Sequence, residues 1–280
     1  MNERLIVASA LVVALAHPAE AQRWRTLEAS RQVHDTSALS VRVEYSAGRF
    51  DLRPATGNTL YNMSLRYDAS RGEAVSRYDS LARSLTVGAK GNHSVRVNLD
   101  DNDGGDLKLQ LAPNVPMDLA LELGAVEGEL QLGGMALSDL SIKGGAAEIT
   151  VRFDAPNRVR MHVMNIEIGA ASVKLMHAAN AGAERIKANV GVGSLDLDLS
   201  GPLTHDVEIN ASLAMGEITL RVAPEVGVMV EAKTFLGDMH SSGLIKRGDY
   251  WYSADYDAAP RKVRVQLKAF LGGFKLRRAS

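Results

Sequence analysis

Oxygen-bearing side chains gather in one short run, Asp100-Asp101-Asn102-Asp103-Gly104-Gly105-Asp106. Carboxylate oxygens around glycine turns can coordinate Ca²⁺, so Asp101, Asp103 and Asp106 are candidate calcium ligands. The run departs from an EF-hand loop, because Ala112, and no bidentate glutamate, stands at the twelfth position counted from Asp101. A solvated turn between two strands explains the same residues, so both interpretations stay open.

Acidic residues also recur at one place in a repeated unit of the chain. If the units stack, these side chains would form an acidic column, interrupted by serines, that could meet a cation or a basic partner. The simpler interpretation is polar residues that face water beside buried neighbours. The column consists of Glu129, Glu148, Glu217 and Asp238, with Ser172 and Ser194 between them.

Two further groups could recognise or process a carbohydrate. Tyr250, Trp251 and Tyr252 form an aromatic cluster that could stack on sugar rings, or that could cap the end of a core. Asp196 and Asp198 point to the same side of one predicted strand, as the paired carboxylates of a polysaccharide-active enzyme would. We see no trio of basic residues that clearly joins them, and we expect no catalytic residues.

Other familiar chemistry lacks sequence support. The chain has no cysteine, and its histidines show neither HxH nor HExxH spacing, so no zinc site is predicted. A nucleophile elbow of the form G-x-S-x-G is also missing. We expect no cofactor. Asn165, Asn189 and Asn210 recur at repeat-like steps and are predicted to form an amide ladder on neighbouring strands.

A repeated unit must position these residues. It consists of a small residue, one further residue and an apolar residue that opens an alternating run, and it returns about every 19 to 24 residues. Period-two alternation with frequent turns indicates strands. Stacking would bury one apolar column and form an all-β solenoid; a two-sheet sandwich is the alternative. The column is Leu130, Ile149, Val173, Leu195, Ile218 and Met239.

The N-terminal residues follow the order of a secretory signal peptide. A 12-residue apolar run from Leu5 to Ala16 precedes Pro18 and the small residues Ala19 and Ala21. We predict a signal peptide over 1–21, cleavage before Gln22, a linker or cap over 22–37, and the β-solenoid domain over 38–280. Residues 22–32 could form a short helix or a loose tail. No second apolar stretch is long enough to hold the mature chain in a membrane.

The composition narrows the class of protein. Hydrophobic residues make up 46% and charged residues 23%, which is typical of a folded globular chain. The formal net charge is -1, so the basic face that a nucleic-acid-binding protein uses to neutralise phosphates is not expected.

Structural motifs of the chain resemble a known family. Val115-Pro116-Met117-Asp118-Leu119, Gly133-Gly134-Met135-Ala136-Leu137 and Gly144-Gly145-Ala146-Ala147-Glu148 are similar to toast-rack, adhesin-like domains of bacterial envelope proteins. They are also similar to the C-terminal domain of LiaF-type cell-wall-stress regulators. The resemblance covers roughly residues 38 to 280 and implies a single-stranded right-handed β-helix without established catalytic residues.

Together these observations predict a non-catalytic, exported protein of the periplasm or cell surface that binds an envelope protein or a glycan. The alternatives are a regulatory partner in envelope stress and a polysaccharide-active β-helix enzyme. Self-association through the ends of the solenoid also stays open, because unpaired strand edges permit it.

Overall fold

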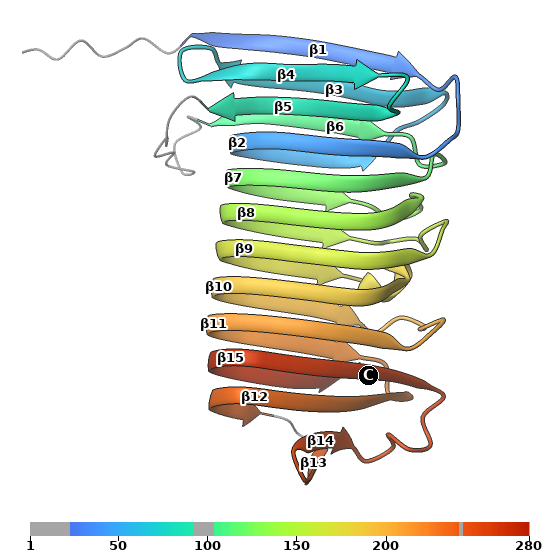
Figure 1. The fold of residues 1–280 in the computed structure, drawn as a ribbon, viewed down its shortest axis with the longest axis vertical. Helices are drawn as coiled ribbons and strands as arrows, with labels where there is room; N and C mark the ends of the chain where they lie inside the picture. The colour runs from blue at the N-terminus through green and yellow to red at the C-terminus, as the bar shows by residue number, and fades with distance from the viewer. Residues whose placement is uncertain (1–22, 92–103, 241–242, 280) are drawn as a thin grey trace, which may run out of the picture.

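The computed structural model describes residues 23–91, 104–240 and 243–279 (Figure 1). These residues form strands throughout, with one 3-10 turn, η1 (Ala178–Ala181), in the described part. The prediction of an all-β fold is therefore confirmed. The strands are β1 (Trp24–Gln32), β2 (Leu39–Pro54), β3 (Thr59–Asp68), β4 (Gly72–Asp79), β5 (Ser84–Gly91), β6 (Gly105–Leu111), β7 (Met117–Gln131), β8 (Leu137–Arg152), β9 (Met161–Met176), β10 (Ala183–Leu199), β11 (Val207–Val222), β12 (Val226–His240), β13 (Leu244–Arg247), β14 (Tyr250–Ser253) and β15 (Arg261–Arg278).

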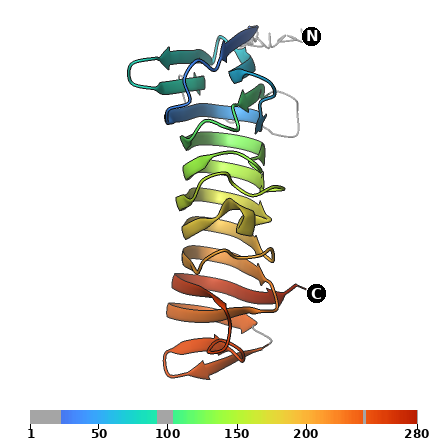
Figure 2. The same ribbon diagram turned by 90° about the vertical axis from the view of Figure 1, so that its right-hand side faces the viewer.

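Long strands stack in parallel along the longest axis of the molecule (Figures 1 and 2). From β2 through β7, β8, β9, β10 and β11, each strand pairs with the next in parallel register. Antiparallel strands occupy the two ends, with β1 on β3 at the N-terminal end and β14 between β12 and β13 at the other. The long strands therefore form two extended outer faces.

Alternating side chains explain why these segments are strands. In β7, inward residues such as Leu119, Leu121 and Leu130 are buried, while Glu122 and Glu129 at alternate positions are exposed. Equivalent apolar residues of neighbouring strands lie side by side, so each strand completes the core of the next. A buried aliphatic side chain contributes about 1.5–3 kcal/mol relative to an exposed one, which makes the stack cooperative.

Each long strand bends once near its middle, and small residues occupy the bend. The strip contains Gly124, Gly145, Gly169 and Gly191 on successive strands from β7 to β10. A Cβ on Gly191 would lie 2.3 Å from the carbonyl oxygen of Gly169, so the strands approach too closely there for any other residue. We call this strip the corner of the stack.

Two predictions about the elements were wrong. Residues 24–32, expected as a short helix or a loose tail, form strand β1, because pairing with β3 satisfies their backbone groups. The predicted rung at Met239 does not follow that of Ile218 directly. Strand β15 lies between β11 and β12, so Phe274 is the neighbour of both Ile218 and Met239.

The predicted register also needs a correction at the first step of the column. Gly128, not Leu130, lies opposite Ile149, and Leu130 lies opposite Val151. Gly128 faces the core and not the corner. Phe50, which lies on the other side of Gly128, is only 1% exposed and fills this layer of the core.

Candidate interaction surfaces

The C-terminal halves of the long strands share one outer face, which we call the charged face. Its first outward row, next to the corner, does contain the acidic residues that the repeat predicted, with one exception. In the backbone register of β7 and β8, Glu127 lies opposite Glu148. Glu129 therefore lies in the next outward row, opposite Thr150. The first row runs Arg49, Glu127, Glu148, Ser172, Ser194, Glu217, Gly273 and Asp238 in backbone register.

The glutamates of the charged face are paired with cations of the chain itself. Lys275 Nζ lies 2.5 Å from a carboxylate oxygen of Glu217, and this hydrogen bond holds the pKa of Glu217 below its usual value. Arg49 lies 3.4 Å from Glu127, and Lys174 lies 4.0 Å from Glu148. Exposed ion pairs of this kind contribute little to stability, but each places a basic group beside a carboxylate of the row.

A hollow of about 380 Å³ opens on the charged face across β9, β10, β11 and β15. Three cations from three strands surround two carboxylates of β10 there. The sequence suggested the carboxylates but did not join any basic residues to them. The charged residues that line the hollow are Lys174, Asp196, Asp198, Glu217, Arg221 and Arg277.

A backbone hydrogen bond and a nearby arginine hold the Asp198 side chain in place. Its side chain is only 13% exposed, one oxygen accepts the backbone N–H of Ser200 at 2.9 Å, and the other lies 3.7 Å from Arg221. Asp196 is exposed two residues away. Both carboxylates lie among cations of neighbouring strands, where they can accept hydrogen bonds from a polar ligand.

The opposite face does not carry the predicted amide ladder. Asn165 and Asn210 share a row, but Lys187 separates them, and Asn189 lies in the next row opposite Glu167. Asn165 instead donates to Glu167 on its own strand at 3.0 Å. The predicted ladder is wrong because Lys187, and not Asn189, lies opposite Asn165, which leaves Asn189 two residues further along its strand.

A carboxylate pair that sequence reasoning missed lies on that same face. Asp118 and Asp139 are opposite each other on β7 and β8. Burial, and then the charge of Asp139, raise the pKa of Asp118 above its usual value, while His162 acts in the other direction. Matching the two strands in register would have revealed the pair, but the sequence alone did not fix that register.

The aromatic cluster lies at the C-terminal end of the stack. Strand β14 pairs antiparallel with β12, which places Trp251 opposite Val230, and Trp251 packs against the core. Tyr252 contacts Tyr256 edge-on, with ring centroids 5.1 Å apart. Tyr250 is 36% exposed. The cluster therefore lies where a cap would lie, and Tyr250 stays partly exposed.

One ligand of the calcium candidate is described, and it has another partner. Asp106 is the second residue of β6, and its carboxylate lies 3.8 Å from Lys108 Nζ. Asp101 and Asp103 lie outside the described residues. In the described part of the chain, no group of three or more histidine or acidic side chains could hold a metal ion. No helix among those residues is long and apolar enough to cross a membrane.

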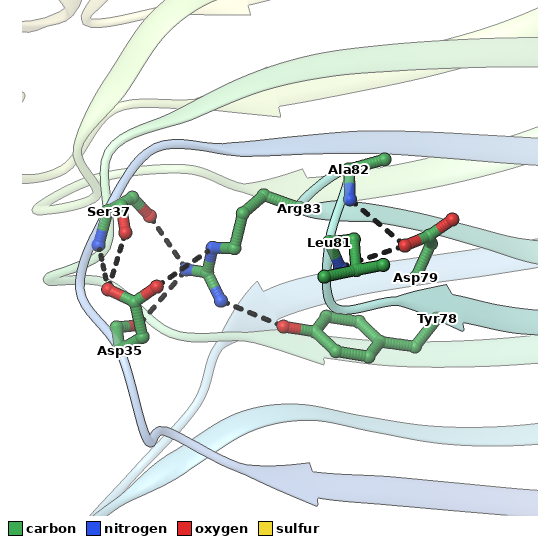
Figure 3. Close-up of polar contacts among 7 residues, drawn as sticks. All are labelled: Asp35, Ser37, Tyr78, Asp79, Leu81, Ala82 and Arg83. Atoms are coloured by element: carbon green, nitrogen blue, oxygen red, sulfur yellow. Dashed lines mark hydrogen bonds and ion pairs between the residues drawn. The ribbon is translucent and has the colours of Figure 1, made fainter.

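A polar network fastens the N-terminal end of the stack (Figure 3). Arg83 donates to Tyr78 Oη at 2.8 Å and to the backbone oxygens of Ser37 and Asp35 at 2.7 and 3.0 Å. Ser37 in turn donates to the Asp35 carboxylate, which lowers the pKa of Asp35. The network ties the β1–β2 connection to the β4–β5 hairpin, so its role is structural.

A family profile for the N-terminal domain of toast_rack, DUF2154, matches residues 19–176. The chain belongs to the toast-rack family. The resemblance drawn from its motifs is confirmed over this range, which ends with β9. No curated protein matches the chain.

Three solved structures of bacterial proteins are similar to the chain over most of its length. A candidate cell adhesion protein from Clostridium sporogenes is 16% identical, with a TM-score of 0.47, over 91% of this chain and all (100%) of that chain. A candidate adhesin from Bacteroides fragilis is 9% identical, with a TM-score of 0.35, over 90% of this chain and 97% of the other. Another from Parabacteroides merdae is 9% identical, with a TM-score of 0.30, over 91% and 96%.

Proposed function

We propose that this toast-rack protein is a non-catalytic, exported binding module of the cell envelope. In this proposal the parallel stack is a right-handed β-solenoid that presents the charged face to an envelope protein or a glycan. The observation that carries it is the hollow across β9, β10, β11 and β15, where fixed charges of both signs point outward from rigid strands.

The cations of the hollow support a ligand that offers anionic or hydroxyl oxygens. Arg277 is exposed and forms no ion pair with the described residues, so its guanidinium can donate two parallel hydrogen bonds to a carboxylate of a ligand. Asp196, exposed beside it, can accept hydrogen bonds from hydroxyl groups. An acidic polysaccharide or an acidic protein segment has both kinds of group.

A pull-down tests this function. Residues 22–280 serve as bait against solubilised envelope, followed by mass spectrometry, and the same protein is applied to a polysaccharide array. The variant Arg221→Gln/Arg277→Gln is expected to lose the captured ligand. The control is Arg53→Gln, which removes an arginine that is 61% exposed and paired with Asp51 at the N-terminal end of the same face.

The outcomes separate the alternatives. A glycan retained by the native protein and lost by the hollow variant supports a binding module. Capture of a membrane sensor protein through the hollow would favour the envelope-stress role. Cleavage of a bound polysaccharide that is abolished by Asp198→Ala would replace the proposal with an enzyme. A ligand captured equally by the native protein, the hollow variant and the Arg53→Gln control would exclude the hollow as the binding site.

A further inference from the structure

Three large apolar side chains stand exposed in one row at the corner of the stack. Val192 of β10, Met215 of β11 and Leu271 of β15 are 53%, 55% and 51% exposed. Parallel register places Met215 between the other two, so they occupy adjacent strands. We call these three residues the apolar ridge.

The fold itself does not require large residues in this row. The same row on β2, β7, β8 and β9 holds only alanine. These residues are Ala47, Ala125, Ala146 and Ala170. Alanine satisfies the corner on four strands, and a half-exposed side chain contributes little to the core, so stability does not explain the ridge. The ridge lies at one end of a row that otherwise holds only small residues. Large apolar side chains that are exposed together in this way indicate a surface that a binding partner or a membrane covers.

The charges beside the ridge indicate what covers it. Strand β15 carries seven basic residues and no acidic residue. Lys268, which is exposed, flanks the ridge on one side, and Lys233 lies next to it in register. On the other side the nearest acid, Glu217, is neutralised by Lys275. Lys233 is paired with Glu231 at 2.9 Å, whereas Lys268 forms no ion pair with the described residues. An apolar strip bordered by this unpaired ammonium group, on a strand whose charged residues are all basic, is complementary to an anionic lipid surface.

The size of the ridge argues against a second protein copy. Three half-exposed side chains present on the order of a few hundred Å², whereas a standard protein interface buries about 800 Å² on each partner. A bilayer needs no such area, because apolar side chains can enter the acyl boundary while lysines contact the headgroups. We propose that the apolar ridge docks the corner of the stack on an anionic membrane surface. This inference goes beyond the proposed function, because it concerns the corner and not the charged face.

Vesicle sedimentation tests the docking with purified residues 22–280. We expect the native protein to bind phosphatidylcholine vesicles that contain phosphatidylglycerol, less well as salt rises, and to bind pure phosphatidylcholine weakly. The variant Val192→Ser/Met215→Ser/Leu271→Ser should partition at least about tenfold less. The matched control Ala125→Ser/Ala146→Ser/Ala170→Ser alters the same row at its other end and should bind like the native protein.

Charge is tested separately. Lys268→Gln should weaken binding to the anionic vesicles by about fivefold and should reduce its salt dependence. Equal binding by the native protein and the ridge variant would overturn the inference. So would a concentration-dependent dimer, measured by light scattering, that the ridge variant abolishes. The vesicles hold neither envelope protein nor glycan, so this result is independent of ligand binding at the hollow.

Discussion

Gly272 lies directly beside Gly216 at the corner, and a Cβ on Gly272 would lie 1.8 Å from the carbonyl oxygen of Gly216. No side chain fits at that distance, so the backbones of β11 and β15 would have to separate. We predict that Gly272→Ala destabilises the protein by about 1–3 kcal/mol or more, measured by urea unfolding. The matched control is Gly145→Ala, whose Cβ would lie 3.5 Å from its nearest neighbour and should change stability by no more than about 0.5 kcal/mol. Equal effects of both changes would contradict this account of the corner.

The inserted position of β15 can be tested by engineered disulfides, because the chain has no cysteine of its own. Thr219 of β11 lies opposite Lys275 of β15, and His240 of β12 lies beyond Lys275. Thr219→Cys/Lys275→Cys should therefore oxidise readily. Thr219→Cys/His240→Cys should not, because two strand spacings, about 9.6 Å, exceed the reach of a disulfide. Mass spectrometry after mild oxidation gives the answer, and the reverse result would place β12 next to β11.

The strand order shows where sequence reasoning succeeds and where it stops. Alternation and the small residues of the corner were sufficient to predict parallel, stacked strands, because both patterns follow from local geometry. The order of β12 and β15 was not predictable, since Met239 and Phe274 open the same kind of unit and either would complete the apolar column beside Ile218. Which of the two strands lies beside β11 depends on the path of the chain from β12 to β15, and no local sequence pattern specifies that path.

Gly128 explains the error in the candidate site. A glycine followed two residues later by leucine matched the corner unit, so Glu129 was assigned to the row of Glu148. In the structure Gly128 faces the core, between Phe50 of β2 and Ile149 of β8 in register. The alternation of Val126, Gly128 and Leu130 carries the correct register. The hollow escaped notice for a different reason, because Arg277 joins Asp196 in its lining only through strand β15, which lies beside β11.

Arg83 should be more important to the N-terminal end than its position in a turn suggests. Its side chain is 16% exposed and donates to Tyr78 and to two backbone oxygens of the β1–β2 connection. Hydrogen bonds from a charged group contribute about 1.5–3 kcal/mol, so Arg83→Met should lower the melting temperature and speed amide exchange in β1. Arg77→Met, on exposed β4, is the control. Unchanged exchange in β1 would show that the network does not fasten this end.

Calcium binding at Asp101, Asp103 and Asp106 remains a prediction that one measurement can decide. A bound Ca²⁺ stabilises the folded state by mass action, so excess Ca²⁺ should raise the melting temperature and EDTA should lower it. Asp103→Asn should remove the difference. Identical melting curves in EDTA and in Ca²⁺ would leave the acidic run as a solvated turn, in keeping with the pairing of Asp106 with Lys108.

Asp118 and Asp139 predict a pH dependence with a definite sign. Because burial and the facing carboxylate raise the pKa of Asp118 in the folded protein, the folded state binds more protons than the unfolded chain as pH rises through the usual aspartate range. Stability from this site is therefore present at low pH and is lost as pH rises through the raised pKa. Like charges directly opposite on paired strands cost roughly 0.2–1 kcal/mol, so Asp118→Asn should stabilise the protein by that amount at pH 7 and have almost no effect at pH 3. Urea unfolding at both values measures it, with Asp196→Asn as the control on the charged face. A stabilisation by Asp118→Asn that is equal at both pH values would exclude carboxylate repulsion as its cause.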